Sequence, residues 1–197
     1  MKVVLASGNR HKYAEMKDAF AETGIELVFG GDFENPIEPE ETGTTFEENA
    51  TQKAEAWVKA TGLPAMSDDS GIEVDAIGRQ PGIHSARIVP GSDADRVDWL
   101  LDQIKDIKDP AKRTGRFVAC LVIVFPDGRE KLVCQRACEG TIAFEVSKGS
   151  AGFGYDPIFI PEGYDKTFAD LGDEIKRKIS HRALAIKGLA EKLQVVL

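Results

Sequence analysis

The sequence predicts an α/β fold built around a mixed β-sheet. Short apolar segments alternate with longer segments of helical periodicity, which is typical of strands joined by helices. Two longer strand-like segments also flank "PDGR", residues 126–129, and predict an antiparallel hairpin. With 197 residues, 42% of them hydrophobic, the chain can bury a core as one domain over 1–197, or as two lobes that share one sheet.

The N-terminal part predicts a strand, a helix and a second strand. "KVVLAS" (2–7) is expected to be a buried strand because its β-branched run is short and ends in a Ser-Gly-Asn turn. A helix over about 10–22 follows, and its periodicity directs four residues inward: Met16, Ala19, Phe20 and Thr23. Residues 26–30 predict the second strand, and 31–43 an acidic loop with two prolines.

The remainder of the chain mixes strands and helices. The expected elements are a helix at about 45–61, two short strands within 65–77, a helix at 92–106, hairpin strands at 116–125 and 130–140, a glycine-aromatic loop running into a strand at 152–160, and a closing helix at 180–194. Ser180 is the expected N-cap of that last helix.

Composition excludes several classes of protein. A net charge of −8 argues against a nucleic-acid-binding surface. The N-terminal apolar run is too short for a signal peptide, and no segment approaches the roughly 20 apolar residues of a membrane span, so we expect a cytoplasmic protein. Cys120, Cys134 and Cys138 are too few and odd in number for a disulfide framework, and are expected to pack as small apolar side chains.

Cations stand at the start of the first predicted helix. A helix N-terminus carries partial positive charge and favours acidic residues, yet this one begins with Arg10, His11 and Lys12. A bound anion would resolve the conflict, because backbone N–H groups and cations would converge on it. A solvated basic turn is the alternative, and the Walker motif is absent.

A lysine lies within the apolar stripe of the helix predicted at 45–61. The helix starts at Thr44 and Thr45, with glutamates at capping-box spacing. At 100° per residue its stripe contains Phe46, Ala50, Lys53 and Trp57. Lys53 therefore requires a partner, unless it extends past Trp57 to water.

Arg182 repeats the anomaly in the closing helix. It shares a stripe with Ile186, Leu189 and Leu193, and lies in the first turn beside His181. A buried pair with a carboxylate is the plain explanation. Together with the two lysines, however, it indicates a polyanionic or acceptor-rich ligand.

The segment "SDDSG" and the loop "PEETG" supply acids. Asp68, Asp69, Glu40 and Glu41 carry the hard oxygen ligands that Mg²⁺ takes, usually one or two carboxylates completed by phosphates and water. Acids and lysines together suit metal-assisted attack of water on a phosphoryl group. Because strand neighbours point to opposite faces, we expect Asp69 to face the ligand and Asp68 to face away. Alternatively, "DDSG" is a plain turn with an Asx-type bond.

Six ordered motifs resemble one family over essentially the whole chain. They are "SGNRHK", "EETGTTFEENATQKA", "LPAMSDDSGIEVDAI", "PGIHSAR", "GFGYDPIF" and "KISHRALA". Together they resemble the inosine triphosphate pyrophosphatase family, also called the Ham1 family. The resemblance implies an elongated, bent mixed sheet flanked by helices, two lobes with a central cleft, and a homodimer. It also implies Mg²⁺-dependent hydrolysis of ITP, dITP and XTP to the monophosphate and pyrophosphate.

The same resemblance implies roles for individual residues. The triphosphate-binding segment corresponds to Ser7, Gly8, Asn9, Arg10, His11 and Lys12, and Lys53 is a further phosphate-side lysine. Asp69 corresponds to the metal ligand and proton acceptor, Glu40 to a second metal ligand, and Ser70 to a substrate-site residue. The base-binding elements correspond to Phe153, Gly154, Tyr155, Asp156, Lys176, His181 and Arg182.

The hydrogen-bonding groups of the purine base explain why donors would be needed at the base-binding residues. Hypoxanthine and xanthine present a keto acceptor where adenine presents an amino donor, so donors such as His181 and Arg182 favour the former. His84 departs from the family, which more usually has an aromatic residue there, and is expected to be a structural histidine with its polar atoms satisfied.

Two other functions fit the sequence. A nucleotide-binding module without catalysis would use the cations but gains nothing from Asp69 and Glu40. A Maf-type pyrophosphatase would act on other nucleotides, and a substrate panel distinguishes it.

Overall fold

The structure is a computed structural model that describes residues 1–21 and 24–196. The chain divides into two compact units, each assembled from separate stretches of sequence. The first contains the described residues of Met1–Asp69, Ala119–Arg136 and Arg182–Leu197, and the second contains Ser70–Val118 and Ala137–His181. Thr23 and the last residue of the helix predicted at 10–22 lie outside the described residues, as does the side chain of Ala19.

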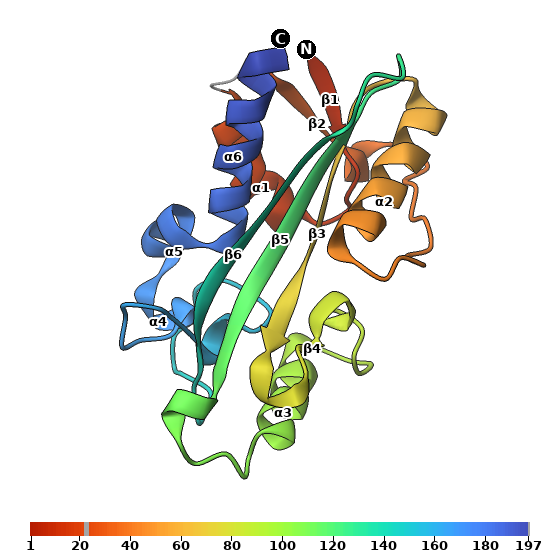
Figure 1. The fold of residues 1–197 in the computed structure, drawn as a ribbon. Helices are drawn as coiled ribbons and strands as arrows, with labels where there is room; N and C mark the ends of the chain where they lie inside the picture. Colours follow the sequence, from red (N-terminus) through yellow and green to blue (C-terminus); the bar gives the residue numbers. More distant parts are fainter. Residues whose placement is uncertain (22–23, 197) are drawn as a thin grey trace. The chain divides into compact units, whose positions relative to one another are not determined.

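Within the described residues, seven strands form one mixed sheet, as predicted (Figure 1). They are β1 (Lys2–Leu5), β2 (Glu26–Phe29), β3 (Ala65–Val74), β4 (Gln80–Pro81), β5 (Thr114–Val124), β6 (Leu132–Ile142) and β7 (Phe159–Pro161). The order is β2-β1-β3-β5-β6-β7, with β4 beside β3. β1 is parallel to both β2 and β3, whereas β4 is antiparallel to β3, and β7 to β6.

The helices follow the predicted pattern with two additions. They are α1 (Arg10–Ala21), α2 (Phe46–Thr61), α3 (Asp93–Gln103), α4 (Phe168–Leu171), α5 (Asp173–Ile179) and α6 (His181–Val196). The sequence did not predict α4 and α5, because helices of four and seven residues are too short to show a clear period. None of the helices in the described part of the chain is long and apolar enough to cross a membrane.

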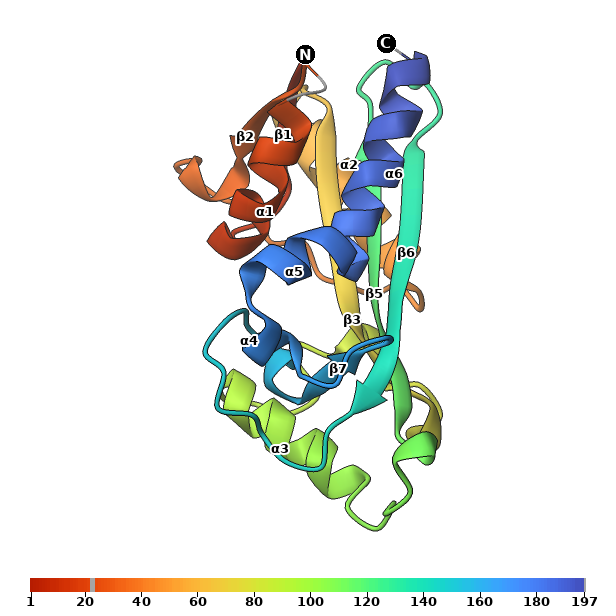
Figure 2. The same cartoon turned by 90° about the vertical axis from the view of Figure 1, so that its left-hand side faces the viewer.

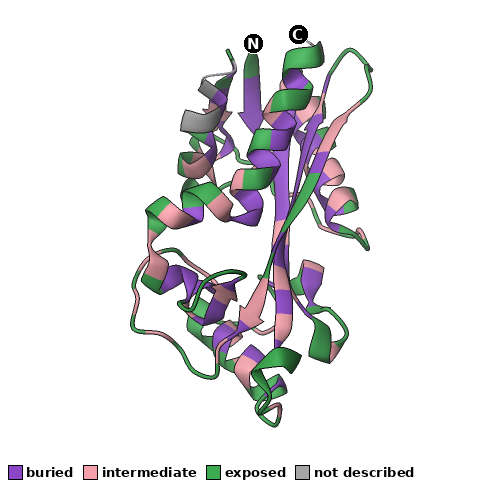
Figure 3. Ribbon diagram, turned by 60° about the vertical axis from the view of Figure 1, so that its left-hand side comes forward, coloured by how far each residue is buried: buried purple, intermediate pink, exposed green. Residues whose placement is uncertain are grey.

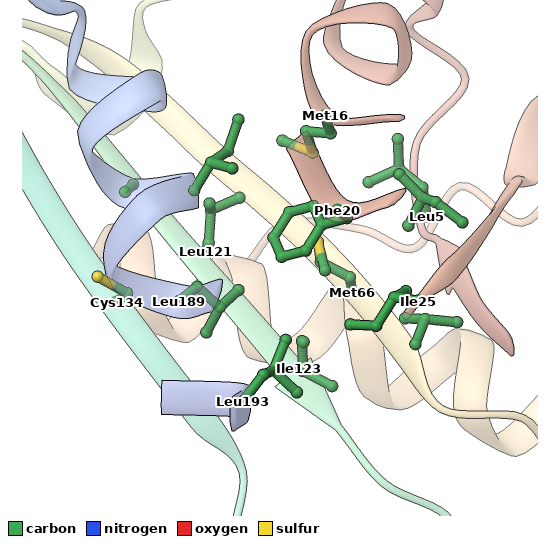
Figure 4. Packing of buried hydrophobic residues seen from close by; sticks show 14 of the residues in the cluster. Leu5, Met16, Phe20, Ile25, Met66, Leu121, Ile123, Cys134, Leu189 and Leu193 are labelled. Carbon is green, nitrogen blue, oxygen red and sulfur yellow. The ribbon is translucent and has the colours of Figure 1, made fainter. Parts of the chain in front are cut away.

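In the first unit, alternation along the strands divides the core into two parts. Val3 and Leu5 of β1 pack with Met66, α1 and α6, while Val4 packs on the opposite face with Ala65 and Trp57 of α2. Figures 1 and 2 show α1 and α6 on one side of the strands and α2 on the other. Figure 4 shows the first of these two parts of the core from close by. Figure 3 shows that many residues along the strands are buried.

The second unit has its own core around β3, α3 and the aromatic residues of its last third. Phe117, Phe159 and Phe168 pack together, with ring centroids 4.6 to 6.2 Å apart. Arg113 is also buried in this unit, and its guanidinium donates to four backbone carbonyls, those of Ile104, Ile107, Ile142 and Ala143. These bonds compensate the loss of water around the charge.

The segment around the two aspartates differs from the prediction. Instead of two short strands or a turn at "DDSG", residues 65–74 form the single strand β3, which is buried over most of its length. The turn was predicted from the local preferences of Asp, Ser and Gly. Neighbouring strands and cations from distant parts of the chain override those preferences, so both acids lie within a strand.

Two smaller predictions concern the cysteines and His84. The three cysteines are buried and free, as expected of apolar packing. His84 is exposed on a short 3-10 turn at Gly82–His84, and its assignment as a structural histidine stays a prediction. A surface turn can hold its imidazole in water, so no buried partner is required.

Candidate functional site

The N-terminus of α1 is capped by Asn9. Its side-chain oxygen accepts the backbone N–H groups of His11 and Lys12 at 2.9 and 3.2 Å, while Ser7 Oγ accepts from the backbone of Asn9. Two of the N–H groups that the sequence offered to an anion are therefore bound within the turn. An anion at this turn would instead be held mainly by side chains.

The cations of this turn point to different partners. Arg10 is exposed and pairs with Asp32 at 2.9 Å, and its guanidinium also lies over the ring of Phe29. Gly8 and His11 are exposed as well. Lys12 differs, because its side chain is only 18% exposed and its ammonium lies 2.7 Å from the Asp68 carboxylate. The solvated basic turn thus describes Arg10 and not Lys12.

Asp68 joins α1 to α6. Its fully buried carboxylate accepts from Lys12 and from two nitrogens of Arg182, at 3.3 and 3.4 Å. Burial alone would raise the pKa of Asp68, but the charges of Arg182, Lys12 and Lys53 outweigh burial and lower it. Asp68 is therefore a permanent anion that holds cations in place, and the buried pair considered for Arg182 is present.

Asp69 lies in a second network, with Lys53 of α2. The Lys53 ammonium donates to Asp69 at 2.9 Å and to Glu41 at 2.8 Å, and Asn49 lies one helical turn before it, 3.5 Å from Asp69. Burial lowers the pKa of Lys53, but Asp69 and Glu41 outweigh it, so the pKa is raised and the lysine stays charged. Lys53 is thus paired and does not extend to water.

The two aspartates differ in their ease of ionisation. Burial raises the pKa of Asp69, and the opposing effect of Lys53 does not fully offset it. Asp69 consequently holds a proton more readily than Asp68, although both lie on β3. A carboxylate of this kind can accept a proton during a reaction, whereas the strongly paired Asp68 cannot do so readily.

The two lysines meet at one backbone atom. Lys12 Nζ and Lys53 Nζ lie 3.3 and 3.4 Å from the carbonyl oxygen of Asp68, although they come from different helices. Like charges repel, so an arrangement that brings two ammonium groups together is stabilised by nearby anions. It forms a compact positive locus beside two carboxylates, which suits binding of a phosphate chain with a divalent cation.

The donor chemistry here fits Mg²⁺. Among the described residues, the ion pairs of these two networks join four carboxylates to three cations: Glu15, Glu41, Asp68 and Asp69 to Lys12, Lys53 and Arg182. One formal negative charge remains for an added cation. No group of three or more His, Cys, Asp or Glu side chains in the described chain is arranged to hold a metal alone. Mg²⁺ commonly completes such a site with substrate phosphates and water.

The predicted base-binding segment forms a cluster inside the second unit. Asp156 is buried and accepts from Lys176 at 2.6 Å and from the backbone N–H of Phe153 at 2.7 Å. The Lys176 ammonium also lies 4.4 Å from the centre of the Phe153 ring. Gly152 has a φ of 78°, and a Cβ there would run into the Asp156 carboxylate, so this turn requires glycine.

Other predicted residues of the second unit have structural contacts. Gly154 N–H donates to Asp93 at 2.8 Å, and the Tyr155 hydroxyl donates to the Ser85 carbonyl at 2.8 Å. Burial raises the pKa of Tyr155 to about 12. His181 is buried and stacks on Phe117 with ring centroids 4.8 Å apart, while Ser70 is half-buried on β3.

The sequence prediction assigned no role to Asn49 or Glu15, and it gave Glu41 only as one of four candidate acids for Mg²⁺. Glu41 binds Lys53, whereas its neighbour Glu40 is exposed. Asn49 contacts Asp69, and Glu15 contacts Arg182. For Asn49 a signal existed, since it is a polar residue one turn before Lys53 on the buried stripe of α2.

Comparison with known proteins identifies the family. A sequence model described as the Ham1 family matches residues 3–192. This chain belongs to the Ham1 family. Its predicted membership is thereby confirmed.

Ham1 relatives match the chain from end to end. A dITP/XTP pyrophosphatase of Symbiobacterium thermophilum is 47% identical over all of this chain and 96% of its own length. One from Thermus thermophilus is 45% identical over 97% of this chain and 91% of its own. Among solved structures, a HAM1 protein from Coxiella burnetii has a TM-score of 0.90 at 36% identity, with 99% of each chain covered. The Staphylococcus aureus Ham1 protein has a TM-score of 0.89 at 37% identity, with both chains fully covered.

Proposed function

We propose that this protein is a nucleoside triphosphate pyrophosphatase for non-standard purine nucleotides. It hydrolyses ITP, dITP and XTP to the monophosphate and pyrophosphate, and so removes deaminated purines from the nucleotide pool. The observation that carries the proposal is the convergence of Lys12 and Lys53 on one carbonyl oxygen, beside an acid whose pKa is raised. Membership of the Ham1 family, whose matched relatives bear the name dITP/XTP pyrophosphatase, supports it.

Asp69 is the proposed general base. It takes a proton from a water molecule as the water oxygen bonds to the α-phosphorus, and the bond from that phosphorus to the α,β-bridging oxygen breaks. Pyrophosphate is the leaving group. Lys12 and Lys53 offset the negative charge of the phosphates, and Lys53 also holds the Asp69 carboxylate in position.

Magnesium is the proposed cofactor. Asp69 would hold it together with Glu40, as the family resemblance implies, or with Glu41, whose carboxylate already faces the same lysine as Asp69. When bound, Mg²⁺ supplies charge neutralisation and polarises a phosphoryl oxygen. Lys53 keeps the Asp69 and Glu41 carboxylates close together, which prepares two hard oxygen donors for one cation.

The base is proposed to bind at residues of the second unit and the start of α6. Phe153 offers a ring for stacking, and Lys176 and His181 offer donors for the keto group of hypoxanthine or xanthine. Asp156 orients Lys176. Gly154, Tyr155 and Ser70 remain proposed substrate-site residues, as do Ser7 to His11. Arg182 also remains a proposed base-binding residue, and its contacts with Asp68 and Glu15 hold its guanidinium in position.

The partners of the protein are part of the proposal. The family resemblance supports a homodimer, and the acidic composition supports the absence of a nucleic-acid partner. A cytoplasmic location remains part of the proposal. The substrate is a small anion, so a local group of cations is enough to bind it, although the whole chain has a net charge of −8.

A substrate panel with phosphate products resolved tests the function. The purified protein is incubated with ITP, dITP and XTP in Mg²⁺, and we expect pyrophosphate and the monophosphate in equal amounts. EDTA should abolish release, and Mg²⁺ should restore it. Orthophosphate without pyrophosphate would refute the assignment.

The same panel separates the rivals. Faster turnover of dTTP or UTP than of ITP would favour a Maf-type activity. Nucleotide binding in the absence of Mg²⁺, with no hydrolysis in its presence, would favour a non-catalytic binding module. GTP serves as the control for purines with a keto group but an added 2-amino group.

A further inference from the structure

Glu15 contacts the site through Arg182. It lies on α1 three residues after Lys12, so both side chains leave the same face of the helix. Its carboxylate accepts from Arg182 Nη1 at 2.7 Å, and the side chains of Arg182 and Glu15 are 3% and 26% exposed. A short charge-assisted bond with so little solvent access is stronger than an ordinary surface pair.

Arg182 and Lys12 share one oxygen atom. Lys12 Nζ lies 2.7 Å from Asp68 Oδ2, and the Nε and Nη2 atoms of Arg182 lie 3.4 and 3.3 Å from the same atom. The lysine contact is short and the two arginine contacts are long. At this oxygen the two cations therefore compete, and the lysine has the closer position.

We propose that Glu15 is a positioning residue for the phosphate-binding lysine. By binding Arg182, it draws the guanidinium away from Asp68 Oδ2 and leaves that oxygen to Lys12. Glu15 and Lys12 are fixed to one helix, so the four groups form a closed ring in which two anions balance two cations. The inference rests on the proposed function, in which Lys12 binds the triphosphate.

The consequence of losing Glu15 follows from electrostatics. With a neutral side chain at residue 15, Arg182 loses its contact with Glu15, which is shorter than its contact with Asp68. The guanidinium is then attracted mainly to the Asp68 carboxylate. The Asp68 carboxylate would turn toward Arg182. Lys12 would then lose its anchor and bind the phosphates from a less ordered position.

A double-mutant cycle tests whether Glu15 acts through Lys12. The four proteins are wild type, Glu15→Gln, Lys12→Met and the double variant, and KM and kcat for ITP are measured for each. We expect Glu15→Gln to raise KM by about tenfold with kcat changed less than about threefold, because Lys12 binds phosphate and does not accept the proton. In the Lys12→Met background, Glu15→Gln should have no further effect on KM.

Two more variants separate positioning from folding. Glu15→Asp keeps the charge and should retain most of the wild-type affinity. Glu26→Gln removes the exposed glutamate that pairs with Lys2 at 3.4 Å, and should change neither constant. Calorimetric titration with ITP in EDTA repeats the cycle on the dissociation constant, without turnover.

The outcomes distinguish this inference from the proposed function. If wild type releases no pyrophosphate, the proposed function fails, and the calorimetric cycle alone decides whether Glu15 and Lys12 are coupled. If wild type is active, equal effects of Glu15→Gln with and without Lys12 would overturn the inference. Parallel losses of kcat, affinity and melting temperature in both Glu15→Gln and Glu15→Asp would also overturn it, because they indicate a structural role.

Discussion

Asp68 and Asp69 are adjacent, yet their surroundings give them different chemistry. Arg182, Lys12 and Lys53 lower the pKa of Asp68 against the effect of its burial, whereas burial dominates at Asp69 and raises its pKa. Pairs of acids whose pKa values are driven apart commonly divide a structural role from a catalytic one. This division supports Asp69 as the proposed base and Asp68 as the anchor of the lysine.

Replacing Asp69 by Asn keeps the shape of the side chain and removes its basicity. We expect turnover of ITP to fall by at least about 100-fold, since a positioned general base contributes factors of this order. The fold should survive, because Lys53 keeps Glu41 as a partner. Pyrophosphate release and a thermal melt measure the two effects.

Asp127→Asn is the matched control for that variant. Asp127 is an exposed acid paired with Arg129 in the β5–β6 connection, so its loss should leave turnover unchanged. A near-normal rate in Asp69→Asn would show that the proton acceptor is a different group.

At the scale of elements, the ends of α2 are determined by local sequence, whereas the orientation of its buried face is determined by tertiary packing. Its N-cap and its C-terminal glycine are local, since Thr45 accepts from the Glu48 N–H at 3.1 Å and Gly62 has a φ of 68°. The direction of its buried face depends on the sheet, where Trp57 packs against β1 and β3. The helix therefore carries Lys53 to Asp69 by packing, while its caps define where it begins and ends.

Removing the N-cap should weaken the protein without impairing the site. We expect Thr45→Ala to lower the free energy of unfolding by about 1 kcal/mol, because the N–H of Glu48 loses its acceptor. Urea denaturation measures the change, and ITP turnover should remain near that of wild type. Thr45→Ser retains the hydroxyl and should retain most of the stability; a loss as large as that of Thr45→Ala would contradict the capping explanation.

At the scale of the whole molecule, each of the two units has a hydrophobic core of its own. The first is built largely from β1, α1 and α6, and the second from β3, α3 and the residues that follow β6. Because β3, β5 and β6 contribute residues to both units, neither unit is a continuous stretch of sequence. The order of motifs along the chain therefore alternates between the two units, and the boundary divides "SDDSG" between Asp69 and Ser70.

The proposed homodimer is tested on the intact protein. Sedimentation equilibrium at micromolar concentration should give twice the mass of one chain. Phe144 and Val146 of the second unit are 54% and 48% exposed, and burial of such apolar side chains favours association. The mass of a single chain across the whole concentration range would contradict the dimer.

Much of the fold could be predicted because its signals are local. The strand before Ser7, the helix that begins at Arg10, the buried stripe of α2 and the hairpin strands all follow from periodicity and turn residues within a few positions. The short helices α4 and α5 could not be predicted, because they contain too few residues for a period. The continuity of β3 through "DDSG" depends on partners that lie elsewhere in the chain.

The sequence by itself determined that cations stand where helices disfavour them, that Lys53 lies on a buried stripe, and that acids are available to pair with these cations. Only the tertiary structure decided the pairing. Arg182 meets Asp68 and Glu15 across 114 and 167 positions of sequence, and Lys53 meets Glu41 and not Glu40. Periodicity reports which face of an element is buried, whereas the choice among several acids depends on distances of a few ångströms that arise only when distant elements pack together.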